Sequence, residues 1–167
     1  MPTPTYNCIA TSTTTSSVAT VTFSSISGIY TDLVLIVTHQ APSATNHGVR
    51  LNGDTNFNYS GTAIFGSGSS ASSERKTTSE GDGGRRSFMW TNNGSTVIGN
   101  SVIHIMNYSN ATTYKTVLSR GNMPNNGVIA NVNLWHNGAA VTSVTYSASD
   151  STVDSGSTFT LYGIKAE

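Results

Sequence analysis

The apolar residues of this chain fall in short runs split by Gly, Asn, Ser and Asp, and a helical period of about 3.6 residues is nearly absent. The segment TVTF at 20–23 alternates apolar and polar side chains, whereas DLVLIVTHQ at 32–40 carries five consecutive apolar residues. The first pattern is typical of a strand with one face in water, and the second of an interior strand with apolar neighbours on both faces. Many short strands at regular spacing predict an all-β protein, either a sandwich or a barrel.

We expect about ten strands from this spacing. The predicted strands cover residues 6–10, 18–24, 30–39, 48–52, 58–65, 87–91, 97–108, 113–120, 127–136, 141–147 and 158–164. The stretch SVIHIMNY within 97–108 has apolar residues on both faces, so one face is expected in the core and the other against a second subunit or a covering loop. His104 lies in that stretch, and a buried histidine on a subunit axis would make assembly sensitive to pH.

The chain is unusually poor in charge. Only 10% of its 167 residues are Asp, Glu, Lys or Arg, and eight basic residues balance eight acidic ones. A net charge near zero favours association with other protein surfaces and gives no general attraction to nucleic acid. Neither a secretory signal peptide nor a membrane span is expected, because the longest apolar run covers only residues 33–37.

The sequence predicts one domain with two irregular parts. Residues 1–17 are expected to be a flexible N-terminal segment, and residues 18–167 a single β-sandwich domain. A long Gly/Ser-rich loop is expected at 66–86, and it holds seven of the sixteen formal charges. Such a loop is either a mobile insertion or an arm that becomes ordered on contact with another protein.

No constellation of catalytic, metal-binding or cofactor-binding residues stands out. The four histidines are scattered and Cys8 is alone, so zinc spacing is missing, and no glycine-rich phosphate loop occurs. Most of the aspartates sit beside Gly, Ser or Asn, where turns explain them. We therefore expect a protein that is not an enzyme and has no cofactor or metal.

Two tryptophans precede Asn-Gly turns, Trp90 in MWTNNGS and Trp135 in LWHNGAA. Exposed there, with Asn137 beside it, such a ring would form a platform for a glycan. The same position suits a tryptophan that caps the end of a sandwich core, and the sequence favours this second interpretation.

Several stretches resemble a group of small virion proteins of tailed bacteriophages, cyanophages included. The similarity covers nearly the whole chain after Val18, and its most specific parts are the LNGD…NYS segment and the terminal F-x-LYGI. The stretches that carry it are FSSISGIYTDLVLIV, VRLNGDTNFNYS, IHIMNYSNATTYKTVLSRG, VNLWHNGAAVTSVTY and GSTFTLYGIKAE. The loop at 66–86 has no counterpart in that group.

The resemblance implies an antiparallel β-sandwich of jelly-roll type that forms a homotrimer. It implies a non-enzymatic protein on the virion, with the capsid surface expected before the tail, whose partners are other copies of itself and the major capsid protein or another virion protein. If the resemblance holds, the N-terminal segment 1–17 and the loop at 66–86 are the candidates for capsid contact. The candidate residues in the loop are Glu74, Arg75, Lys76, Arg85 and Arg86.

Two alternatives stay open. One is a tail fibre or receptor-binding module that recognises host-surface glycans through Trp90, Trp135 and Asn137. The other is a glycan depolymerase, which would need two paired carboxylates. Its candidates are Asp32, Asp54, Asp82, Asp150 and Asp154. Neither nucleic acid nor a membrane is an expected partner.

Overall fold

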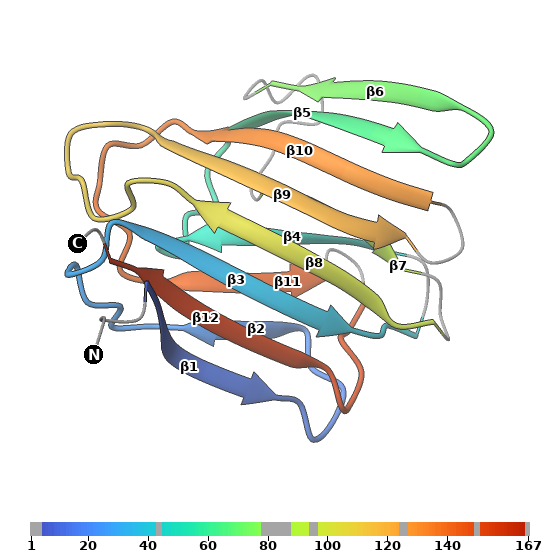
Figure 1. The fold of residues 1–167 in the computed structure, drawn as a ribbon, viewed down its shortest axis with the longest axis horizontal. Helices are drawn as coiled ribbons and strands as arrows, with labels where there is room; N and C mark the ends of the chain where they lie inside the picture. Colours follow the sequence, from blue (N-terminus) through green and yellow to red (C-terminus); the bar gives the residue numbers. More distant parts are fainter. Residues whose placement is uncertain are drawn as a thin grey trace.

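The computed structural model describes residues 5–42, 45–77, 88–93, 97–123, 127–148 and 151–165, and side chains are described in these ranges except at 45, 46, 88–93, 123 and 148. These residues form twelve β-strands and no helix, hence none that could span a membrane (Figure 1). The strands are β1 (Tyr6–Thr13), β2 (Thr20–Phe23), β3 (Asp32–His39), β4 (Thr45–Leu51), β5 (Tyr59–Gly66), β6 (Ala71–Lys76), β7 (Phe88–Asn93), β8 (Gly99–Ile105), β9 (Lys115–Met123), β10 (Gly127–Trp135), β11 (Val144–Ala148) and β12 (Thr158–Ile164).

The strands form two antiparallel sheets. An eight-stranded sheet has the order β1-β12-β3-β8-β9-β10-β5-β6, and a four-stranded sheet has the order β2-β11-β4-β7. Figure 1 shows the large sheet as one run from β1 at the lower edge to β6 at the upper edge. The chain is therefore an all-β protein, an antiparallel β-sandwich of jelly-roll type, as the sequence predicts.

The facing sides of the two sheets bury the core, and the strand patterns explain which side chains enter it. Val21 and Phe23 of β2 are buried while the threonines between them are exposed, which confirms the predicted alternation. In β3 the core side holds Leu33, Leu35 and Val37, all of them fully buried. The other side of β3 is also apolar and carries Val34, which is buried, and Ile36, which is 41% exposed.

The core also encloses a polar group. His39 of β3 and His47 of β4 lie beside Tyr146 of β11, and all three are buried. Burial lowers the pKa of His39 to about 4. Burial, together with the neighbouring His39, lowers the pKa of His47 to about 3. Both imidazoles are therefore neutral at physiological pH.

The two irregular parts expected from the sequence contain strands. Within 1–17, β1 pairs with β12, and the backbone N–H of Thr14 donates to the carbonyl of Ser157 at 2.9 Å. Ile9 and Ala10 also pack against the core, so β1 is held in the sheet. Within 66–86, β6 pairs with β5 along six residues, and residues 78–87 lie outside the described part of the chain.

Candidate functional site

The side of the eight-stranded sheet that faces away from the core, here called the outer face, carries an uncovered row of apolar side chains. The strand register places them side by side: Ile36 opposite Val102, Val102 opposite Arg120, Arg120 opposite Ala130 and Ala130 opposite Ile64. One step along the strands, Leu118 lies opposite Val132. We call Ile36, Ile64, Val102, Leu118, Ala130 and Val132 the apolar patch.

The apolar patch is open to solvent. Ile64 is 60% exposed, Val132 57% and Ile36 41%, although side chains of this size are usually buried. A hollow of about 340 Å³ lies over β5, β8, β9 and β10 in the middle of the patch. A continuous apolar surface of this kind on a stable domain is typical of a contact site for another molecule.

Polar and charged residues lie at the margin of the apolar patch and within it. At the margin, His104 Nε2 lies 2.8 Å from Asp32 Oδ2, and the other oxygen of Asp32 accepts a hydrogen bond from the backbone N–H of Asn107 at 2.7 Å. The exposed Arg120 lies within the row, between Val102 and Ala130. His104 is thus half-buried on the outer face and paired with a carboxylate on an adjacent strand.

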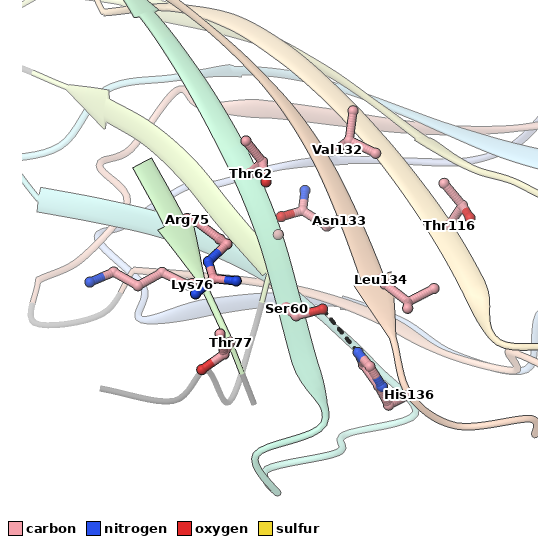
Figure 2. A pocket seen from close by; sticks show the side chains of 11 residues that line it. Ser60, Thr62, Arg75, Lys76, Thr77, Thr116, Val132, Asn133, Leu134 and His136 are labelled. Atoms are coloured by element: carbon pink, nitrogen blue, oxygen red, sulfur yellow. Dashed lines mark hydrogen bonds between the residues drawn. The ribbon is translucent and has the colours of Figure 1, made fainter. Parts of the chain in front are cut away.

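A second hollow of about 530 Å³ adjoins the patch at Thr62 and Val132, near the ends of β5, β6 and β10. Figure 2 shows Ser60 and His136 joined by a hydrogen bond of 2.9 Å between Oγ and Nε2, with Arg75, Lys76 and Thr77 on the side of β6. We call this site the polar hollow, because hydroxyls, amines and an imidazole dominate its wall.

An exposed aromatic ring stands beside the polar hollow. Tyr114 is 58% exposed, and its ring centroid lies 5.5 Å from that of His136 with an angle of 41° between the planes. Strand alternation gives the face of each residue but not the strand pairing that brings the two together. In TTYKT and LWHNG, Tyr114 falls on the face of Thr116, and His136 on the face of Leu134.

The candidate capsid-contact residues lie on β6 or outside the described residues. Glu74 and Lys76 form an ion pair of 2.9 Å, and Arg75 lies opposite Thr62 on the outer face. Arg85 and Arg86 belong to the part of the chain that the structure does not describe.

Of the glycan-contact candidates, Trp135 and Asn137 do not form a platform. Trp135 is only 1% exposed and its Nε1 donates a hydrogen bond of 2.8 Å to Asp54 Oδ2, so the ring caps the core and cannot stack on a sugar. The Asn137 Oδ1 accepts a hydrogen bond from the backbone N–H of Ala139, which uses it in a turn. Trp90 lies in β7, but its side chain is outside the described residues.

The described carboxylates serve structural contacts. Asp54 accepts hydrogen bonds from Asn56, Asn58 and Trp135. Burial by itself raises the pKa of the Asp54 carboxyl, but these hydrogen bonds outweigh burial and lower that pKa below its ordinary value. Asp154 accepts one from Ser17 Oγ at 3.1 Å. Asp82 and Asp150 lie outside the described residues, and within the described ranges no cluster of three or more His, Cys, Asp or Glu could hold a metal ion.

Comparison with known proteins supports the fold. No family model and no curated protein matches the sequence. Among solved structures, an exo-inulinase of Aspergillus awamori is similar with a TM-score of 0.51 and 11% identity. The likeness covers 95% of this chain and 29% of the inulinase, so the chain spans less than a third of that protein. At this identity the likeness shows the fold alone.

Two further structures are similar at lower scores. A galectin of Caenorhabditis elegans has a TM-score of 0.38 and 7% identity, with 93% of this chain and 96% of the galectin covered. A mutant alginate lyase in complex with alginate trisaccharide has a TM-score of 0.30 and 10% identity, with 93% of this chain and 80% of the lyase covered.

Proposed function

We propose that this chain is a non-enzymatic structural protein of a tailed-bacteriophage virion, a capsid decoration or cement protein that assembles as a homotrimer. The observation that carries the proposal is the apolar patch, a solvent-exposed apolar surface on the outer face of a rigid sheet. Burying such a patch removes apolar area from water and stabilises an assembly. The resemblance to small virion proteins supports the surface of the phage head as the location of this assembly.

The occupant of the apolar patch is a second copy of the chain. The protein is neutral and poor in charge, so copies do not repel one another. Arg120 lies within the patch and Asp32 at its margin beside His104, and we place these opposite charges of neighbouring copies together in a head-to-tail contact. Head-to-tail contacts that repeat around an axis close into rings such as trimers.

A trimer bound over the joints between capsid subunits would act as a clamp. Three identical sets of modest contacts act together, since the second and third form at a high effective concentration once the first has formed. Binding to the assembled shell, and not to separated subunits, stabilises the shell by mass action. We place the capsid contact on β6, through Glu74, Arg75 and Lys76, and include Arg85 and Arg86 as further candidates.

The proposal that the protein is not an enzyme is supported by the structural contacts that the described carboxylates make. Glu74 pairs with Lys76, Asp32 with His104, and Asp54 holds a turn together. A glycosidase-type mechanism needs two carboxyl groups that face a common substrate, and these three lie in separate structural contacts.

The decisive experiment measures mass in solution and binding to particles. Light scattering on the purified protein is expected to give a trimer, and Leu118→Glu or Val132→Glu to give folded monomers. Thr20→Glu, on the exposed side of the four-stranded sheet, is the matched control and keeps the trimer. The wild-type protein mixed with particles that lack it is then imaged by cryo-electron microscopy, where density repeated over the icosahedral shell is expected. A monomeric wild type, or density confined to the tail, contradicts the cement proposal.

A second candidate function, recognition of a host-surface glycan, is favoured by the polar hollow. There an exposed Tyr114 and a fixed His136 replace the buried Trp135 as the aromatic platform. This candidate is an alternative to the cement proposal, because Val132, Arg75 and Lys76 line the polar hollow and serve the trimer and capsid contacts in that proposal. A glycan array probed with the wild type and Tyr114→Ala tests this candidate.

A further inference from the structure

We infer that the polar hollow binds an acidic saccharide, a sugar ring that carries a carboxylate, and this inference rests on the glycan-recognition candidate. The hollow joins three chemical features on the outer face: a polar wall of hydroxyls, an apolar floor and an unpaired guanidinium among the described residues. Each feature matches one part of such a ligand.

The apolar floor and the aromatic rim suit the carbon face of a sugar ring. Val132 and Leu134 of β10 line the floor, and the exposed Tyr114 stands at the rim. A tyrosine presents a flat apolar body together with a polar hydroxyl, and so contacts both the C–H groups and the hydroxyls of a sugar. A site built only for a small inorganic anion has no use for this apolar surface.

The polar wall offers hydrogen bonds from rigid positions. Ser60 and Thr62 come from β5 and Thr116 from β9, so the hydroxyls are spread across the sheet and separated by strand spacings. The hydrogen bond from Ser60 to His136 fixes the imidazole, whose ring also packs against Tyr114. Groups held in place before the ligand arrives lose little entropy on binding, which raises the affinity.

The charge of the polar hollow selects an acidic ligand. Arg75 and Lys76 line it, and none of the described residues in its wall is acidic. Lys76 is already paired with Glu74, whereas Arg75 has no ion-pair partner within the described ranges. A guanidinium presents two parallel N–H donors to a carboxylate, so the hollow discriminates between an acid and its uncharged analogue.

Two matched pairs of ligands test the inference. The first is trigalacturonic acid with its methyl ester, and the second is sialyllactose with its methyl ester. Within each pair the sugar framework is kept and the charge changes. Binding to the full chain is measured by isothermal titration calorimetry at low salt and repeated at higher salt. At least one acid is expected to bind about tenfold or more tightly than its neutral partner, with the difference reduced by salt.

Three variants assign the binding to the polar hollow. Arg75→Gln is expected to remove the preference for the acid, and Tyr114→Ala to weaken both members of the pair. Lys165→Gln, a cationic position just beyond β12, is the matched control and leaves binding unchanged. Circular dichroism checks that each variant is folded.

The outcomes separate this inference from the glycan-recognition candidate. Equal affinity for acid and neutral partner, with loss on Tyr114→Ala, overturns the acidic selectivity and leaves glycan recognition standing. Acid preference that survives Arg75→Gln also overturns it, because the charge selection then lies elsewhere. No binding of any of the four ligands, together with an empty glycan array, overturns both.

Discussion

The imidazole ring of His39 lies 4.4 Å, centroid to centroid, from that of His47 inside the core, where neither ring carries a charge at neutral pH. The Tyr146 hydroxyl lies 3.4 Å from the nitrogens of His39. A proton added to either ring would place a cation in an apolar interior next to a second ring that also titrates. The pair therefore links the stability of the sandwich to pH.

We expect the free energy of unfolding to fall as pH drops from about 6.5 towards 4. The folded chain holds both histidines at lowered pKa, whereas the unfolded chain protonates them near the ordinary value of 6.5. The unfolded state thus binds more protons in this range, and stability rises with pH. His39 alone accounts for about 3 kcal/mol at the acid end. Urea denaturation at pH 7, 5.5 and 4.5 measures the loss.

Variants assign this loss to the core pair. His47→Leu is expected to reduce the dependence between pH 6.5 and 4.5 to the part that His39 contributes, while His136→Gln, a half-buried position on the outer face, leaves it unchanged. Equal stability of the wild type at pH 7 and 4.5 would show that the two rings are accessible to protons in the folded state.

Asp54→Ala is expected to lower the free energy of unfolding by about 3 kcal/mol, because it leaves the buried Nε1 of Trp135 and two asparagine contacts without their acceptor. Asp154→Ala is the control, since the Asp154 carboxylate accepts one exposed side-chain hydrogen bond, from Ser17, among the described residues. Guanidinium denaturation followed by tryptophan fluorescence reports both. A loss equal to that of Asp154→Ala would contradict the role assigned to Asp54.

Gly163→Ala is expected to destabilise the fold by about 1–3 kcal/mol. An added Cβ would lie 2.3 Å from Cγ of Tyr30, whose ring packs flat against β12 at this point. Gly28→Ala is the matched control, because its Cβ would meet only Ser109 Cβ at an ordinary 3.6 Å. Thermal unfolding compares the two, and equal melting temperatures would mean that Tyr30 moves aside without cost.

Deleting the chain from Thr158 onward is expected to abolish soluble folding. The deletion removes β12, which pairs with β1 on one side and β3 on the other, so the large sheet loses two interfaces. It also removes Phe159 and Leu161 from the core. Removing only the last two residues, 166 and 167, is the control and retains the fold. A deletion protein with a native circular dichroism spectrum and a sharp thermal transition would refute this prediction.

Most of the fold follows from the sequence because apolar alternation marks the strands. Eleven of the twelve strands overlap predicted ranges, and β6 is the exception. Its sequence, ASSERK, has no large apolar residue, and its place depends on backbone hydrogen bonds to β5. A periodicity of hydrophobicity cannot reveal a strand that buries no side chain.

The candidate site was less predictable, because it depends on which strands are neighbours. Ile64 and Ile36 belong to one surface only because β5, β10, β9, β8 and β3 follow one another in the sheet. Tyr114 and His136 are 22 residues apart and meet through the pairing of β9 with β10. Trp135 caps the core, as the sequence favours, because strand alternation assigns it to the core side.

The position of β12 between β1 and β3 also bears on how the protein is made. β1 leaves the ribosome well before β12, so the strands at one side of the large sheet have no partner until β12 has been made. Contacts between such distant segments form slowly, because the loop between them is long. During that interval the edge of β3 is unpaired and open to strands from other nascent chains. Slower expression at lower temperature therefore suits this topology, since it reduces the number of incomplete chains that can meet.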